Sequence, residues 1–424
     1  MNGAASWSWR DSGIASRPLA IALMLLLTAA LSAQDSRAER AARWRQDLAV
    51  LAEQLPARHI DPFTVLSRRD FDARVKQLDA RLGELDDLTA QFELARLVAA
   101  LGDSHTALQA DELYKGSTLP FGFLALRDGV WCLLAPKENA SCAGQKLVKV
   151  GGQDLVELRR LAATLFVFDN ESAWKARVGS LVTMPRLLWL LGLATSDAEV
   201  ELTFAGSDGK ETTVVAAPGT RQRDSAIVRP DIPPITAFRR DKWFDKSFVE
   251  DAGLLYIQFN RCATSKENDL DAFIASVEKV LSGGGVKAVA LDLQYNGGGD
   301  SRRGDALIAA LARHAPVNGK RNVFGVIGRG TFSSAILNAS TLKSSCGGVL
   351  VGEPSSGSPN HFGELKNFVL PRSRLVVHYS TKRFALGPKG STALVPDHLA
   401  EPTFEDYRSG RDVILEKIRA LIQP

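Results

Sequence analysis

Residues 323–354 read VFGVIGRGTFSSAILNASTLKSSCGGVLVGEP, and this stretch says most about how the chain folds. An apolar, strand-like run stops at a Gly-Arg-Gly turn, two serines open a helix-like segment, and a second apolar strand covers Gly348 to Val351. The first N–H groups of a helix are unpaired and carry the positive end of its dipole. Ser333 is therefore either an ordinary helix cap or a hydroxyl beside donors that could stabilise an oxyanion.

A second glycine-rich turn lies upstream, in residues 288–300, AVALDLQYNGGGD. A buried-strand run ends at Asn296, three glycines follow, and a helix-like stretch covers residues 301–314. Successive glycines let the backbone approach a ligand and point N–H groups at it. Phosphate binding is a rival interpretation, but the turn has neither the Lys-Ser/Thr pair of a P-loop nor a G-x-G-x-x-G pattern. A plain strand-to-helix turn is the remaining alternative.

Six short motifs follow one another along the chain: GDSHT (102–106), LLYIQF (254–259), LDLQYNGGGDS (291–301), GRGTFSSA (328–335), VGEP (351–354) and VPDH (395–398). In this order they resemble the tail-specific, or C-terminal processing, serine peptidase family, and especially its tricorn-like branch with secreted bacterial relatives. The resemblance implies an α/β fold with a crotonase- or ClpP-like spiral core around a parallel sheet. A helical N-terminal region and a β-rich, PDZ-like module would precede that core.

The resemblance also assigns the chemistry of the two turns. It places the nucleophile at Ser333, and the oxyanion hole at the N–H of Ser334 together with that of Gly297 or Gly298. One donor would then follow the nucleophile and the other would face it from a glycine turn. The neighbouring residues expected to contact the substrate are Gly299 and Phe332.

The catalytic base departs from the usual family pattern. Tail-specific proteases use a lysine after the Gly-Glu-Pro turn, and that position is Ser358. The tricorn-like branch uses a histidine preceded by a serine, which matches Ser104 and His105, and a neutral imidazole suits general-base work near pH 7. The alternatives are His361, close to the missing lysine, or a purely structural His105 bonded to Asp103 or to backbone.

The acid that would be the third catalytic residue of the family has no direct equivalent in this sequence. Tricorn-like enzymes carry a glutamate shortly before the Pro-Asp turn, and GPKGSTALVPD contains none. Asp397 in that turn is the tentative acid, Asp103 is the alternative, and the site could also lack an acid. The gap leaves open a second function, a catalytically impaired peptidase scaffold that binds peptides or apolar ligands. An α/β-hydrolase esterase is disfavoured because no G-x-S-x-G elbow surrounds any serine.

The first residues are expected to form a signal peptide. Arg10 and Arg17 precede an apolar run from Leu19 to Leu31, and small residues continue to Ala33. The run is too short for a spanning helix, so export to the periplasm or outside the cell is favoured over an uncleaved anchor. No membrane span is expected after processing.

Removing residues 1–33 takes Arg10, Arg17 and Asp11 from totals of 52 basic and 48 acidic residues, which leaves a net charge of +3. This balance, without a basic block, argues against nucleic acid as a partner. The expected partner is a peptide or protein substrate, with no metal or cofactor. The four cysteines could form disulfides after export, Cys132 with Cys142 first, or all be small buried side chains: Cys132, Cys142, Cys262 and Cys346.

The expected organisation has five segments: a signal peptide (1–33), a helical N-terminal region (34–113), a PDZ-like β-rich module (114–218), a linker (219–241) and a peptidase-like catalytic core (242–424). Apolar residues at helical spacing indicate the first region, and paired turn residues such as Asp128-Gly129 mark strands in the second. Alternation of strands and helices beyond Lys242 indicates a parallel sheet. A purely structural insertion is the alternative to the PDZ-like module.

Overall fold

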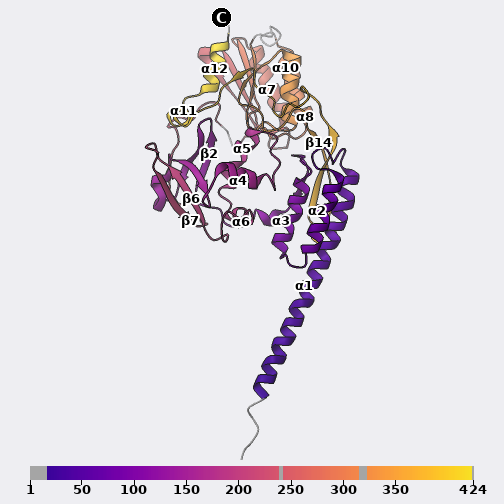
Figure 1. Cartoon of the computed structure of the whole chain (residues 1–424). Coiled ribbons are helices and arrows are strands. Elements are labelled where there is room, and N and C mark those ends of the chain that lie inside the picture. The colour runs from indigo at the N-terminus through magenta and orange to yellow at the C-terminus, as the bar shows by residue number, and fades with distance from the viewer. Residues whose placement is uncertain (1–16, 238–241, 315–321, 423–424) are drawn as a thin grey trace, which may run out of the picture.

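The computed structural model describes residues 17–237, 242–314 and 322–422 (Figure 1). The first sixteen residues of the expected signal peptide lie outside this set. Helix α1 (Arg17–Arg58) projects from the body at its amino end and continues unbroken past residue 33. Within the described ranges, no helix combines the length and the apolar character that a membrane crossing needs.

Three helices form the N-terminal region, as the apolar spacing predicts. Helix α1 packs beside α2 (Arg68–Arg81) and α3 (Asp87–Ala99). Ser67 and Asp86 cap the last two helices by accepting a hydrogen bond from a backbone N–H of the first turn. The most deeply buried side chains at the contact include Leu51, Leu55, Phe71 and Leu94.

An antiparallel, seven-stranded sheet follows, in the order β2-β3-β4-β6-β7, with β5 beside β4 and β8 beside β3. Its strands are β2 (Gly122–Leu126), β3 (Gly129–Ala135), β4 (Lys146–Val150), β5 (Gln153–Asp154), β6 (Val200–Ala205), β7 (Glu211–Ala216) and β8 (Ala226–Ile227). Between β5 and β6 lie the helices α4 (Leu155–Ala162), α5 (Glu171–Leu181) and α6 (Pro185–Leu190). The sequence predicts helices at about 154–165 and 184–193, which correspond to α4 and α6, but it does not predict α5.

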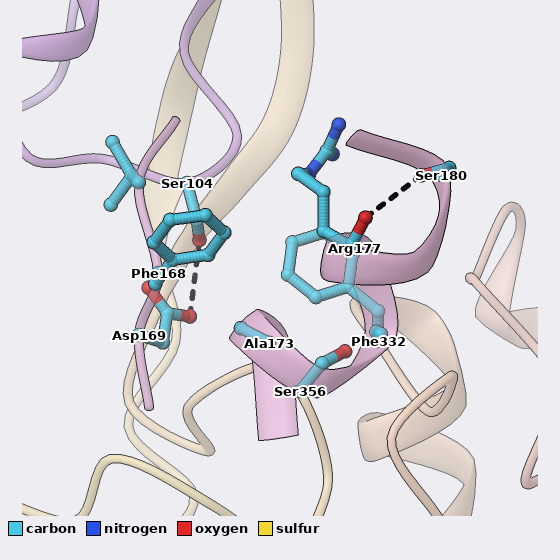
Figure 2. Close-up of a pocket in the computed structure, with 10 residues that line it drawn as sticks. Ser104, Phe168, Asp169, Ala173, Arg177, Ser180, Phe332 and Ser356 are labelled. Atoms are coloured by element: carbon cyan, nitrogen blue, oxygen red, sulfur yellow. Dashed lines mark hydrogen bonds between the residues drawn. The ribbon is translucent and has the colours of Figure 1, made fainter. Parts of the chain in front are cut away.

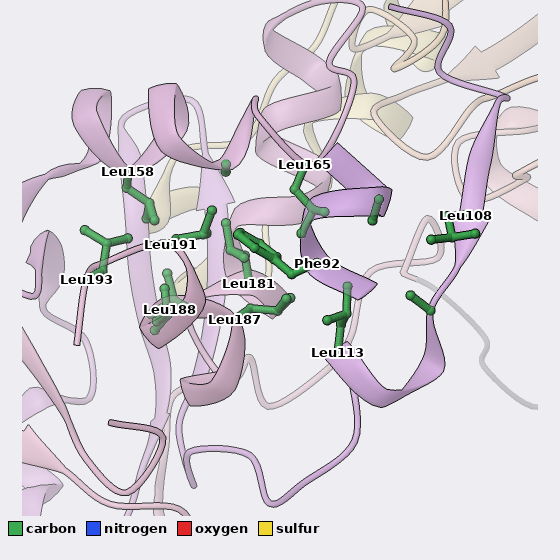
Figure 3. Packing of buried hydrophobic residues seen from close by; sticks show 14 of the residues in the cluster. Phe92, Leu108, Leu113, Leu158, Leu165, Leu181, Leu187, Leu188, Leu191 and Leu193 are labelled. Carbon is green, nitrogen blue, oxygen red and sulfur yellow. The ribbon is translucent and has the colours of Figure 1, made fainter. Parts of the chain in front are cut away.

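The helical region and the seven-stranded sheet share one hydrophobic core. Figure 3 shows Phe92 of α3, Leu158 of α4, Leu181 of α5 and Leu187 of α6 pointing into the same space. Each of these side chains is almost fully buried. Burial of apolar surface is the main favourable term in folding, so the two regions stabilise one another.

A six-stranded sheet forms the C-terminal half, in the order β16-β13-β12-β11-β10-β9. The strands are β9 (Phe244–Val249), β10 (Leu254–Phe259), β11 (Ala288–Asp292), β12 (Val323–Ile327), β13 (Val349–Gly352) and β16 (His398–Leu399). All neighbours run parallel except β9, which is antiparallel to β10. The predicted parallel sheet is therefore confirmed. The accompanying helices are α7 (Leu270–Ser282), α8 (Ser301–Ala312), α10 (Ser334–Cys346), α11 (Phe404–Ser409) and α12 (Val413–Leu421).

The central strands are buried on both faces, which explains their near-continuous apolar sequences. In β10, Leu255 and Ile257 belong to the core that α7, α8 and α10 cover. The alternate residues Leu254 and Tyr256 belong to the opposite core, to which α12 contributes Ile418. Helices on both faces leave the carboxyl edge of the sheet as the place where loops gather.

A three-stranded antiparallel sheet joins the N-terminal region to the C-terminal half of the chain. It contains β1 (Ala107–Gln109), β15 (Val376–Arg383) and β14 (Phe362–Val369), in that order. Ala107 pairs with His378, and Phe368 and Val377 belong to the core of the N-terminal helices. This pairing brings the segment 102–106 beside the residues that flank the hairpin.

The four cysteines are free and buried, so the expected Cys132–Cys142 disulfide is wrong. The Cys132 thiol lies 3.3 Å from the carbonyl oxygen of Leu134, to which it can donate. Burial raises the pKa of the Cys132 thiol to about 12. The cysteines act as small buried side chains, the alternative interpretation of the sequence.

Candidate active site

The glycine turn and the serine turn meet at the carboxyl edge of the six-stranded sheet. The turn 297–299 follows β11, and Ser333 follows β12. The N–H of Phe332 donates to the carbonyl oxygen of Asn296 (3.1 Å), and the Ser334 hydroxyl donates to that of Gly299 (2.6 Å). The two predicted motifs therefore form one contiguous structure, which local sequence alone could not establish.

Ser333 does not cap α10, so the interpretation as an ordinary cap is wrong. Its backbone has φ 51° and ψ −124°, and its side chain makes no capping hydrogen bond. A positive φ at a residue with a Cβ costs roughly 1–3 kcal/mol and tends to occur at functional sites. The residue is only partly buried, which leaves the strained serine within reach of a ligand.

Gly298 lies against the serine turn. At its φ of +105°, a Cβ would lie 2.8 Å from Ser333 Cβ and 3.0 Å from the Ser334 nitrogen. Its N–H donates to Asn296 Oδ1 at 2.9 Å. A Cβ on the neighbouring Gly297 would meet nothing within 4 Å. Close approach of the two turns therefore requires glycine at 298 but not at 297.

We expect Gly298→Ala to lower the free energy of unfolding by about 2–3 kcal/mol, because the new methyl group is both sterically crowded and held at a strained φ. Gly297→Ala is the matched control and should stay within about 1 kcal/mol of the wild type. Urea unfolding of the three proteins measures the difference. Equal destabilisation of both variants would contradict the packing of the two turns.

His105 lies in a stack of three rings. Its ring centroid is 4.4 Å from that of Phe332 and 5.2 Å from that of His361, with interplanar angles of 17° and 14°. The side chain is buried, and neither ring nitrogen has a hydrogen-bond partner in the part of the chain described. Burial, with a smaller contribution from His361, lowers the pKa of His105 to about 4, although Asp103 opposes the shift. The imidazole is therefore neutral at pH 7, and its nitrogens are free to form a hydrogen bond with a substrate or a nucleophile.

His361 is the second buried imidazole. Its Nδ1 lies 2.7 Å from the carbonyl oxygen of Ser358. Because a carbonyl oxygen only accepts, Nδ1 carries the hydrogen and Nε2 keeps a lone pair. Burial lowers the pKa of His361. The two predicted candidate bases thus share one stack, and neither is hydrogen-bonded to Ser333 among the described contacts.

Asp103 holds the backbone of His105, not its ring. One carboxylate oxygen accepts hydrogen bonds from His59 Nε2 (3.0 Å), Thr106 Oγ1 (2.5 Å) and Ser380 Oγ (2.7 Å), and the other accepts the His105 N–H (3.0 Å). Burial raises the pKa of Asp103, but these donors outweigh it and lower the pKa to about 2. This buried network fixes the loop that carries His105. His59 could not be predicted as a member of this network, because its partner Asp103 lies 44 residues away in the chain.

Asp397 lies away from the other predicted residues. One of its oxygens pairs with Lys343 Nζ at 2.6 Å, and the other accepts the N–H of Leu350 at 2.9 Å. Lys343 is near the far end of α10 from Ser333, about 15 Å along the helix at 1.5 Å per residue. The structure does not bring Asp397 to the imidazoles, because its carboxylate joins the end of α10 to the start of β13.

Asp169 and Asn170, which the sequence analysis missed, join three segments of the site. One Asp169 oxygen accepts from the Ser104 hydroxyl (3.1 Å) and from the Ser358 N–H (3.0 Å). Burial raises the pKa of Asp169. Asn170 caps α5 through its Oδ1, and its Nδ2 donates to the carbonyl oxygens of Ser355, Ser356 and Thr392. An Asx residue before Glu171 is an N-cap signal, but it does not reveal these distant partners.

We expect Asn170→Ala to destabilise the protein by about 2–3 kcal/mol, because it removes both the cap and the side-chain donors to the loop 355–358. Asn170→Ser keeps a capping oxygen and loses the amide donors without placing a charge against the carbonyl oxygens, so it separates the two contributions. Thermal unfolding should place the serine variant between wild type and alanine. A wild-type melting temperature for Asn170→Ala would show that these hydrogen bonds do not hold the loop.

A cavity of about 360 Å³ opens beside these residues. Figure 2 shows Ser104, Phe168 and Asp169 on one side of it, with Arg177 and Ser180 on the other. Helix α5 lines it with side chains at helical spacing, those of Ala173, Ala176, Arg177 and Ser180. Val167, Phe332 and Ser356 complete the lining, and through Phe332 the cavity adjoins the serine turn.

Known proteins resemble this chain in fold. No family model matches it, and no curated protein matches its sequence. The solved structure of mature CPAF complexed with lactacystin has 14% identity and a TM-score of 0.62, and covers 90% of this chain and 98% of its own. Mature CPAF alone gives 14% identity, the same coverage and a TM-score of 0.60. The photosystem II D1 C-terminal processing protease has 15% identity and a TM-score of 0.42, over 89% of this chain and 97% of its own. At these identities the likeness to CPAF shows a shared fold.

Proposed function

We propose that this chain is a serine peptidase of the tail-specific kind, which cleaves peptides or protein tails through an acyl-enzyme on Ser333. The observation that carries the proposal is the strained, accessible Ser333, which has a glycine turn against it and a neutral imidazole stacked on its neighbour Phe332. The resemblance of six motifs to the tail-specific family and the fold shared with mature CPAF support it.

The reaction follows from these positions. Ser333 Oγ attacks the carbonyl carbon of the substrate while His105 accepts the hydroxyl proton. The N–H of Ser334 has no acceptor within α10, because it is the first residue of the helix. We propose that this N–H and the N–H of Gly297 donate hydrogen bonds to the oxyanion, because the N–H of Gly298 already donates to Asn296 Oδ1.

The second half of the reaction reverses the proton's path. The imidazolium of His105 returns the proton to the leaving amine, and water then attacks the acyl-enzyme with the same imidazole as base. The family lysine cannot take this role, because its position is Ser358, whose hydroxyl has the carbonyl oxygens of Asn360 (3.0 Å) and Ser391 (2.7 Å) as acceptors. Asp103 would act as a positioning residue through the His105 backbone.

We propose a division of the chain into domains that goes with this function. The parallel sheet with helices on both faces supports a crotonase- or ClpP-like core in residues 242–424. The strands of residues 122–216 support a PDZ-like module at 114–218. In the proposed linker at 219–241, β8 adds a short strand beside β3. We also propose that residues 1–33 are a signal peptide and that the chain works in the periplasm or outside the cell.

A non-catalytic peptide-binding scaffold is the second candidate, and one observation favours it. No carboxylate in the described residues is hydrogen-bonded to the His105 ring, and Asp397 lies at the other end of α10. Reaction with a fluorophosphonate, which phosphonylates activated serine hydroxyls, separates the candidates. Labelled wild-type protein supports the peptidase, and protein that stays unlabelled while binding peptides supports the scaffold.

A further inference from the structure

The cavity beside Phe332 adjoins a second, larger space. A cleft of about 840 Å³ lies between helices α2, α3 and α4, and it shares Val167 and Phe168 with the cavity as lining residues. The two spaces therefore lie next to each other at these residues. The cavity offers apolar surface from Val167, Phe168, Ala173 and Phe332.

The cleft and the cavity carry an excess of positive charge. Five arginines line them, against the carboxylates of Glu93 and Asp169: Arg74, Arg81, Arg96, Arg159 and Arg177. Arg81 and Arg96 share the single carboxylate of Glu93, at 3.9 Å and 3.3 Å. Arg159 pairs with Glu171, which is not part of the lining. A concave surface with such an excess of one charge concentrates ligands of the opposite sign.

Two of these arginines have no ion pair among the described residues, Arg74 and Arg177. Both are exposed, and Arg74 projects from α2 into the cleft. The Arg177 guanidinium lies 4.4 Å from the ring centroid of Phe166, which is itself a cleft residue. This cation–π contact holds the charge at the junction between the two spaces. Both charges are thus available to a ligand, and that of Arg177 is held in place before the ligand binds.

We infer that the peptide bound at this site places an apolar side chain in the cavity and acidic residues in the arginine cleft. The inference rests on the proposed function for the statement that the ligand is a substrate. An acidic segment would supply the carboxylates that Arg74 and Arg177 lack, while a basic one would face uncompensated like charges.

Binding to the Ser333→Ala variant tests the inference without turnover. Two fluorescent peptides share a central leucine and differ only in three flanking residues, aspartate in one and lysine in the other. We expect the aspartate peptide to bind at least about tenfold more tightly at low salt, and this ratio to fall toward one in 0.5 M salt. Adding Arg74→Gln and Arg177→Gln should reduce the ratio to about threefold or less.

Arg69→Gln is the matched control, since Arg69 lies on the same helix as Arg74 but outside the cleft, with 92% of its side chain exposed. This control should keep the wild-type ratio. Equal binding of the two peptides, tighter binding of the lysine peptide, or an equal loss in the Arg69 variant would overturn the inference. The salt dependence needs no arginine variant, so a variant that failed to fold would leave the test intact.

Fluorophosphonate labelling of the wild type separates the two levels of the argument. Labelled protein with no preference between the peptides would overturn the acidic-ligand inference and leave the peptidase proposal standing. Unlabelled protein with the expected preference would overturn the peptidase proposal while the charge of the ligand remained as inferred.

Discussion

Ser333→Ala is expected to abolish fluorophosphonate labelling and to lower peptide hydrolysis by about 10⁶-fold, the loss that follows removal of a serine nucleophile in a well-studied protease. The reason is structural as well as chemical. Ser333 has a strained backbone and no capping bond, so its hydroxyl has no structural task that would explain the strain. Mass spectrometry of the labelled protein and hydrolysis of a fluorogenic peptide measure the two losses.

Ser344→Ala provides the control for this prediction. Ser344 lies on the same helix, is exposed, and donates its hydroxyl to the carbonyl oxygen of Thr341. Its removal should leave labelling and hydrolysis unchanged. Persistent labelling of Ser333→Ala at the wild-type rate would remove Ser333 from the mechanism, and with it the assignment of the glycine turn as an oxyanion site.

His105→Gln is expected to lower kcat/KM by about 10²–10⁴-fold, the range that general-base catalysis contributes. His361→Gln should cost less than about tenfold, because His361 lies on the far side of His105 from Phe332 in the ring stack. Comparison of the two variants therefore decides between the candidate bases. The reverse order of effects would assign proton transfer to His361.

The pH dependence of kcat/KM gives a second test of the base. The base must be neutral to accept a proton, so activity falls as the pH drops through its pKa in the free enzyme. Since burial lowers the pKa of His105 to about 4, the acid limb should lie near pH 4 and not near 6.5. A limb near 6.5 would show that a solvated imidazole performs the chemistry.

The protonation of His105 should also make the free energy of unfolding depend on pH. The unfolded chain protonates this histidine near pH 6.5, whereas the folded protein keeps it neutral down to about pH 4. Acidification across this window therefore favours unfolding, by about 3 kcal/mol for a shift of this size. His105→Gln should remove that part of the pH dependence, a readout that does not depend on activity.

Much of the fold could be predicted from local sequence. Near-continuous apolar runs such as 254–259 indicated strands buried on both faces, and the structure places them in a parallel sheet. Apolar residues at helical spacing located α2 and α3, and the alternation of strands and helices beyond Lys242 located α7. Helix α5 escaped prediction because its faces contact both the seven-stranded sheet and the site cavity, so its apolar residues do not form a single stripe.

The site could be predicted only in part. The motifs identified the serine and glycine turns, and GDSHT identified His105, because these are local patterns with their own backbone requirements. The prediction that Asp397 is the partner of the imidazoles is wrong, because its carboxylate pairs with Lys343. The contacts of Asp169 and Asn170 at the site could not be predicted, because their partners lie up to 222 residues away in the chain.

Sequence by itself determined the elements that depend on near neighbours: the apolar strands, the glycine at a strained turn, and the serine that opens α10. Tertiary structure alone decided which side chains meet, namely the ring stack around His105, the Asp103 network and the arginine cleft beside Phe168. The physical reason is one of range. Backbone preferences and periodicity act over a few residues, whereas these contacts form only when packing has brought distant segments within a few ångströms of one another.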